Sequence, residues 1–213
     1  MTRLDRPKEA PPRVEQLEDV VRGVFDRVRL PYLLGHLPTR PVMAVFATIN
    51  GFLSIAIMGF AALLTNQPFV FPSLGPSAFL FFYSPLVPAA SPRNAILGHL
   101  IGAAVGWSCL LAFGLRDDGP STATGVTWER LVAAGLSLGL TSGLMVLIHA
   151  PHPPAGATTL IIELGVLTEF SEIAVLMLAV VLLTIQAVVI NRLAGIDYPL
   201  WAARVPEPRI VPP

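Results

Sequence analysis

Two proline-rich stretches carry the residues of this chain that could do chemistry inside an apolar environment. One covers residues 150–167 and reads A-P-H-P-P-A-G-A-T-T-L-I-I-E-L-G-V-L. The other covers residues 71–85 and reads F-P-S-L-G-P-S-A-F-L-F-F-Y-S-P. At one constant offset the two stretches align Pro72 with Pro153, Gly75 with Gly156, and Ser77 with Thr158.

The pattern of both stretches predicts a broken helix whose N-terminus faces an anion. Prolines interrupt a helix, and the residues after each interruption are suited to start a short new one. A helix N-terminus carries about half a positive charge and several unpaired N–H groups, so it binds anions without a lysine or arginine. Glycines allow close approach, and hydroxyls add donors. We expect the anion to bind between the two helix starts at Ser73, Leu74, Gly75, Ser77, His152, Ala155, Gly156, Ala157, Thr158 and Thr159.

His152 is expected to act as a protonatable gate in this site, because imidazole changes charge near neutral pH. His149 and His152 have a spacing that would suit a metal on a regular helix, but the prolines beside them disfavour that helix. We therefore expect no metal and no cofactor. Polar and ionisable residues inside a membrane are functional candidates, although each of them could instead bond to a neighbouring helix, cap a loop or lie at the interface. The candidates for a gate or pathway are Asn50, Arg93, Asn94, His99 and Glu163.

The composition places these stretches in a membrane protein. Of the 213 residues, 54% are hydrophobic and only 13% are charged, whereas a soluble domain carries about 25% charged residues. The mean hydropathy is +0.68, and the formal net charge of +0 gives no indication of nucleic-acid binding. Four apolar runs are long enough to cross a bilayer, at residues 41–64, 94–115, 128–149 and 172–193.

The two broken helices divide the transmembrane domain, residues 41–193, into similar halves. Residues 41–115 and 128–193 each contain a long span, a broken helix and a second long span. If the broken helices cross the membrane, six elements form two inverted repeats; if they are re-entrant, there are four crossings and parallel halves. We favour inverted repeats, because matching interruptions in two halves are typical of transporters. The strip of Gly98, Gly102 and Gly106 predicts close helix contact and makes a homo-oligomer plausible.

The segments outside this domain predict the orientation in the membrane. Residues 1–40 hold most of the lysine and arginine, which indicates that this end lies in the cytoplasm. Residues 13–30 have an amphipathic pattern, which suits a helix on the membrane surface or against a second protomer. Residues 194–213 form a proline-rich tail. We expect both termini on the cytoplasmic side of a bacterial inner membrane.

Three motifs give the chain a family resemblance: His152 to Thr159 (H-P-P-A-G-A-T-T), Phe71 to Ala78 (F-P-S-L-G-P-S-A), and Ser91 to Asn94 (S-P-R-N) followed by His99. Together they resemble the HPP family of integral membrane proteins over roughly residues 35–200. The resemblance implies about four transmembrane helices, and some members carry CBS domains, which are not expected here. Plant chloroplast and cyanobacterial members are associated with nitrite transport, so the resemblance implies a carrier of nitrite or a similar anion.

The sequence therefore predicts a secondary transporter of a small monovalent anion, nitrite foremost, with H⁺ as a candidate coupling ion and the lipid bilayer as its surroundings. A passive channel lined by the same residues is one alternative. A membrane scaffold or sensor that acts through residues 13–30 is another. No enzyme and no catalytic residues are expected, because the apolar region lacks G-x-S-x-G, H-E-x-x-H and a carboxylate pair.

Overall fold

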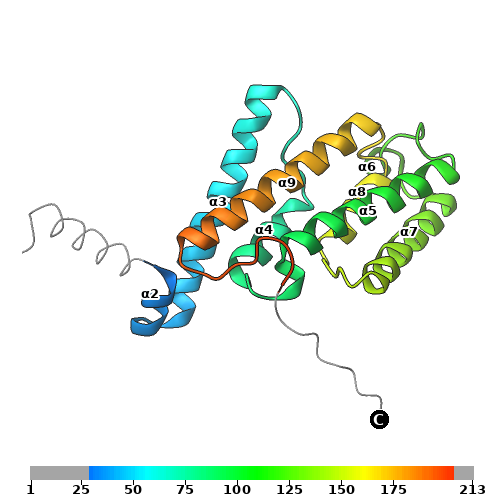
Figure 1. Ribbon diagram of the computed structural model, residues 1–213. Helices are drawn as coiled ribbons and strands as arrows, with labels where there is room; N and C mark the ends of the chain where they lie inside the picture. Colours follow the sequence, from blue (N-terminus) through cyan, green and yellow to red (C-terminus); the bar gives the residue numbers. More distant parts are fainter. Residues whose placement is uncertain (1–28, 204–213) are drawn as a thin grey trace, which may run out of the picture.

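The computed structural model describes residues 29–203, which contain helices and no strand (Figure 1). Four helices are long and apolar enough to cross a membrane: α3 (Thr39–Thr65), α5 (Pro92–Ala112), α7 (Trp128–Leu147) and α9 (Phe170–Leu193). Two short helices, α4 (Leu74–Tyr83) and α8 (Ala155–Glu163), follow the predicted interruptions. The remaining elements are α2 (Leu30–His36), the 3₁₀ turn η1 (Pro88–Ala90) and α6 (Ser121–Thr124). The predicted amphipathic helix falls almost wholly outside the described range.

Local signals in the sequence set where the long helices begin. Ser91 accepts a hydrogen bond from the Asn94 N–H at the start of α5, where Pro92 occupies the first turn. Thr127 caps α7 in the same way by accepting from the Arg130 N–H at 3.3 Å. At α9 the side chains of residues 169 and 172 form a reciprocal capping box. These caps satisfy N–H groups that would otherwise be unpaired at the ends of the spans.

The distribution of side chains is that of a helical bundle in lipid. Large apolar side chains point outward from each long helix, among them Phe52, Leu100, Leu131 and Leu178. The interior holds an unusual number of polar groups, because helices inside a membrane associate through close van der Waals contact and hydrogen bonds. The fully or almost fully buried polar residues include Ser54, Ser73, Ser77, Asn94, His99, Arg130, Ser137, Thr141, His152, Thr158, Thr159 and Glu163.

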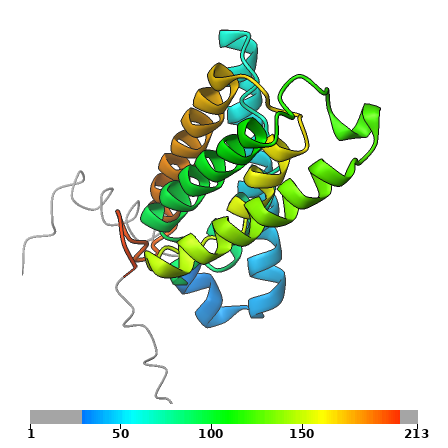
Figure 2. The same cartoon turned by 90° about the vertical axis from the view of Figure 1, so that its right-hand side faces the viewer.

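The helices form two groups of three that share the same contact pattern. α4 packs on α3 and α9, and α8 packs on α7 and α5. α3 also contacts α9, α7 contacts α5, and α5 and α9 meet between the groups. Figure 1 shows this order, with α3 and α7 on opposite sides of α5 and α9. In Figure 2, α7 crosses in front of α8. Each short helix therefore packs between a long helix of its own half and the last long helix of the other half.

Hydrogen bonds between distant segments define the two ends of the bundle. At the end that we call the Arg93 end, the Arg93 N–H donates to Trp201 O at 3.0 Å, and the Arg93 side chain donates to Ile148 O at 3.2 Å. At the opposite end, the Glu163 end, Arg130 Nη1 donates to Glu163 O at 2.8 Å. α5 therefore starts where α7 ends, and α7 starts where α8 ends, so α8 runs parallel to α5 and antiparallel to α7.

α4 runs in the opposite direction to α8. The turn η1 that follows α4 lies at the Arg93 end, because Ala90 O accepts a hydrogen bond from the Tyr198 hydroxyl just after α9. The start of α3 is held at the same end, where the Leu30 N–H donates to Ala194 O at 2.9 Å. The N-terminus of α4 and the N-terminus of α8 thus approach each other from opposite directions.

The glycine strip of α5 is occupied by α8 within the same chain. A Cβ atom placed on Gly98 would lie 2.7 Å from the Cβ of His152, and one on Gly102 would lie 2.6 Å from the carbonyl oxygen of Ala155. At Gly106 the corresponding distance to Thr159 O is 2.9 Å. The strip is therefore used to seat the second broken helix and gives no support to a homo-oligomer, which stays a prediction.

Candidate functional site

Four buried side chains, from three helices and one turn, meet where the two short helices begin. Ser77 comes from α4, His99 from α5, His152 from the turn before α8, and Thr158 from α8 itself; each is at most 1% exposed. Ser77 Oγ lies 3.0 Å from His99 Nε2 and 3.0 Å from His152 Nε2. His99 Nδ1 lies 2.7 Å from Thr158 Oγ1. We call these four residues the His–Ser cluster.

The turn η1 holds the cluster from the Arg93 end. Its three carbonyl oxygens each accept a hydrogen bond from a side chain of a different segment. Pro88 O accepts from Asn94 Nδ2 at 3.0 Å, Ala89 O from His152 Nδ1 at 2.8 Å, and Ala90 O from the Tyr198 hydroxyl. This arrangement positions the His152 ring and links it to the chain segment that follows α9.

The two helix starts differ in the donors that they leave free. At α8 the N–H groups of Ala155, Gly156 and Ala157 each donate to the carbonyl three residues earlier, at 2.9 to 3.1 Å. These amides are therefore satisfied, and the predicted cradle around Gly156 is corrected. At α4 the space around Gly75 is open, with no atom within 4 Å of a Cβ placed there, and its N–H has no backbone acceptor among the described residues.

Other predicted cradle residues support the helix starts rather than face the cluster. Leu74 is buried in the apolar core, and Gly156 is half-buried against Leu138 of α7. The Thr159 hydroxyl bonds to the Thr141 hydroxyl at 2.9 Å, which ties α8 to α7. Ser73 is fully buried beside α4, and its hydroxyl has no hydrogen-bond partner among the described residues.

Three of the gate candidates make structural bonds. Asn50 Nδ2 donates to Phe46 O at 2.8 Å within α3, and Asn94 is held by Pro88 O and the Arg93 side chain. Arg93 donates to two carbonyls just after α7, Ile148 O at 3.2 Å and His149 O at 2.8 Å, which fits the loop-capping alternative rather than a mouth that attracts anions. Arginine near a helix C-terminus also complements the helix dipole.

His99 and Glu163 have different surroundings. His99 belongs to the His–Ser cluster and joins α4, α5 and α8. Glu163 is fully buried at the end of α8, and neither of its carboxyl oxygens has a hydrogen-bond partner among the described residues. Arg130, which is also buried, donates to the backbone carbonyl of Glu163 and to Gly119 O at 3.0 Å. The Glu163 side chain is therefore enclosed by protein at this end of the bundle, and both its pathway role and its interfacial position stay predictions.

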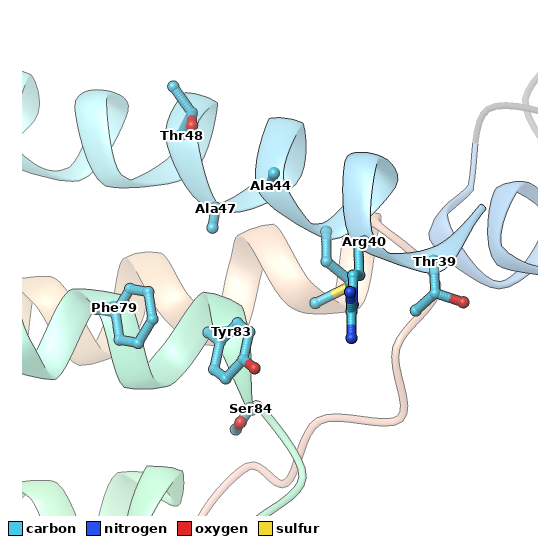
Figure 3. Close-up of a pocket in the computed structure, with 9 residues that line it drawn as sticks. Thr39, Arg40, Ala44, Ala47, Thr48, Phe79, Tyr83 and Ser84 are labelled. Carbon is cyan, nitrogen blue, oxygen red and sulfur yellow. The ribbon is translucent and has the colours of Figure 1, made fainter. Parts of the chain in front are cut away.

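A separate open groove of about 900 Å³ lies between α3 and α4 (Figure 3). Arg40 and Thr48 line it from α3, and Phe79 and Tyr83 line it from α4. Phe79 and Tyr83 are exposed, whereas Ser77 on the same helix is buried, so the groove and the cluster occupy different faces of α4. Sequence reasoning missed this groove, because its lining residues follow no motif.

A bundle of apolar helices with a polar interior, in which two broken helices meet at buried histidines, defines a helical membrane protein. The family model described as HPP, transmembrane region, matches residues 37–199, and the chain belongs to this family. The resemblance in the three sequence motifs is thereby confirmed.

Two transmembrane proteins of Dictyostelium discoideum are similar to the chain. One is 32% identical over 161 residues, which is 73% of this chain and 53% of the relative. The other is 31% identical over 112 residues, covering 52% of this chain and 33% of the relative. The chain thus spans about half the length of the first relative and a third of the second. No solved structure matches the chain.

Proposed function

We propose that the protein is a secondary transporter of a small monovalent anion, with nitrite as the first substrate to test. The observation that carries the proposal is a pair of buried imidazoles at the meeting point of two broken helices. Within the described residues no carboxylate contacts either ring. If an imidazole takes up a proton there, the positive charge has no counter-ion in the protein, and a buried unpaired charge is unfavourable. A small anion beside the cluster would offset it.

The open start of α4 supplies the other half of the proposed site. Gly75 is exposed and its N–H has no backbone acceptor, and the buried Ser73 hydroxyl has no hydrogen-bond partner, among the described residues. Together with the positive end of the α4 dipole, these donors suit an anion. We therefore propose that the anion binds on the α4 side of the cluster, because the first amides of α8 already have acceptors.

The transport cycle follows from the arrangement of the helices. We propose six membrane elements in two inverted repeats, in which α3, α4 and α5 correspond to α7, α8 and α9. The contact pattern is unchanged by that exchange, and corresponding helices run in opposite directions, which supports the proposal. Alternating access would then arise when one group of three helices rocks against the other. The basic N-terminal region favours a cytoplasmic location for the Arg93 end.

The experiment is uptake into liposomes that contain the purified full-length chain. Nitrite, nitrate, formate, chloride and bicarbonate are compared with and without an imposed proton gradient. His152→Asn is the test variant, because an amide N–H can still donate to Ala89 O but cannot carry a proton at neutral pH. His36→Asn is the matched control, since His36 lies in α2 and bonds to Tyr32 O.

We expect His152→Asn to lower nitrite uptake at least tenfold, and His36→Asn to leave it unchanged. Uptake that saturates and can be driven uphill by the proton gradient indicates a carrier, whereas non-saturating downhill flux indicates a passive channel. If none of the five anions moves, the proposal is wrong. In that case, capture of one partner through residues 13–30 would favour the scaffold or sensor.

A further inference from the structure

We propose that the His–Ser cluster is a proton relay that loads one proton, and only one, onto its imidazole pair for each anion carried. The relay runs from Thr158 through His99 and Ser77 to His152. The proposal deepens the proposed function and rests on it for the anion. The existence of the relay itself can be tested without transport.

One carbonyl fixes the protonation state of the imidazole next to it. Ala89 O can only accept a hydrogen bond, so its 2.8 Å contact requires a proton on His152 Nδ1. In a neutral ring His152 Nε2 is then an acceptor. Ser77 must donate its hydroxyl proton to that nitrogen across 3.0 Å. The competing acceptor for this proton, Ser73 O, is more distant, at 3.4 Å.

The direction of the remaining bonds follows from this assignment. Ser77 has only one hydroxyl proton, so at the other 3.0 Å contact its oxygen must accept from His99 Nε2. His99 Nδ1 is then unprotonated in the neutral ring. Thr158 donates its hydroxyl proton to it at 2.7 Å. All the hydrogen bonds of the cluster therefore point from Thr158 towards Ala89.

An additional proton moves by short transfers along these hydrogen bonds and reverses the donor and acceptor of each bond between Thr158 and His152. Thr158 is buried in this structure, so the relay is loaded when the proposed rocking of the helix groups admits water to this end. Thr158 Oγ1 then takes a proton from a hydronium ion and releases its own to His99 Nδ1. His99 releases its Nε2 proton to Ser77 Oγ, and Ser77 releases its original proton to His152 Nε2. Each O–H or N–H bond that forms is matched by one that breaks, and no group is oxidised or reduced. The product is a His152 imidazolium, while Ser77 now donates towards His99.

The pair can hold only one such proton. The ring centroids of His99 and His152 are 5.0 Å apart, and repulsion between two charges at that distance opposes the second protonation by on the order of a hundredfold. Arg93, Arg130, Arg192 and Tyr198 on the surrounding segments bond to backbone carbonyls elsewhere, and Tyr83 is exposed. The buried Glu163 carboxyl, at the far end of α8, has no hydrogen bond to either ring. The charge of one proton is therefore balanced by one monovalent anion.

The first test is ¹⁵N NMR of the histidine-labelled full-length chain in bilayers. At neutral pH we expect His152 to carry its proton on Nδ1 and His99 on Nε2, with signals assigned through His→Asn variants. On acidification the pair should take up a single proton. A His152 ring protonated on Nε2, a His99 ring protonated on Nδ1, or two protons bound to the pair would overturn the relay.

The second test removes the proton-accepting hydroxyl at the Thr158 end of the relay. Thr158→Val keeps the shape of the side chain but cannot pass a proton to His99, so proton-driven anion uptake should fall at least tenfold, and Thr158→Ser should restore it. Thr184→Val is the matched control, because the Thr184 hydroxyl is buried and bonds only to Val180 O within α9. An unchanged His152 signal in Thr158→Val shows that the variant is folded.

The flux results separate failure of the relay from failure of the proposed function. Wild-type protein should move protons and anions in a ratio of one to one. If Thr158→Val takes up anions as fast as wild type, the relay is wrong while anion transport stands. If wild type moves none of the anions yet shows the predicted tautomers and single protonation, the relay stands and the proposed substrate is wrong.

Discussion

Gly102→Ala should loosen the seat of α8 and disturb the His–Ser cluster. The new Cβ would lie 2.6 Å from Ala155 O and 2.9 Å from Thr159 Oγ1, whereas ordinary contact begins near 3.4 Å. The obstacle at 2.6 Å is backbone, so α8 must move by a large part of an ångström. Overpacking of this kind costs about 2 kcal/mol. For a chain of this length that corresponds to a fall in Tm of about 4–8 °C.

Gly139→Ala on another long helix is the matched control. Gly139 on α7 is exposed and has no atom within 4 Å of a Cβ placed on it. Gly139→Ala should leave the stability unchanged or raise it by up to about 1 kcal/mol, because alanine favours a helix over glycine. Thermal unfolding in detergent, followed by tryptophan fluorescence, compares the two variants. If Gly102→Ala melts like wild type, α8 is not seated on α5 as described.

Three further predictions concern the two ends of the bundle. Arg130→Met should destabilise the fold by roughly 2–4 kcal/mol, because it leaves one buried and one half-buried carbonyl without their charged donor, and chemical unfolding would measure the loss. Burial raises the pKa of the Tyr198 phenol, so its contribution to stability is fully present below the ordinary tyrosine pKa of about 10 and is lost as the pH rises above it. Tyr198→Phe should therefore lower Tm at neutral pH, by loss of the bond to Ala90 O, and should flatten the alkaline fall in Tm. Glu169→Gln should cost less than about 1 kcal/mol, since its ion pair with Arg116 is exposed; a larger loss in a salt-dependent melt would contradict this.

Much of the membrane topology could be predicted from the sequence, because hydrophobic length and helix-start signals are local. The four spans were expected within two to three residues of the observed helices, and both interruptions became short helices. The constant offset between the two proline stretches aligned Ser77 of the first stretch with Thr158, in the first turn of the second short helix. In the structure Ser77 contacts His152. Because the motif occurs twice, the sequence predicted that the two helix starts would face each other, but it did not predict the hydrogen bond between Ser77 and His152.

The remaining features depend on tertiary contacts that no local pattern encodes. The Ala89 carbonyl that orients His152 belongs to a backbone turn, which any residue could supply. The amides at the start of α8 are satisfied because Pro153 and its neighbours adopt a turn whose carbonyls lie within reach. The partner of the Gly98, Gly102 and Gly106 strip could not be identified from sequence, since flat glycine strips serve contacts within and between chains alike.

The account depends on Ser77 of one broken helix touching His152 beside the other. The most direct measurement is a ¹³C–¹⁵N dephasing experiment by solid-state NMR on protein in bilayers, with ¹³C in serine and ¹⁵N in histidine. Because Ser77 Oγ lies 3.0 Å from both His99 Nε2 and His152 Nε2, both ring signals should dephase strongly, and Ser77→Ala should abolish the effect. Dephasing of neither ring, or dephasing that persists in Ser77→Ala, would contradict the account.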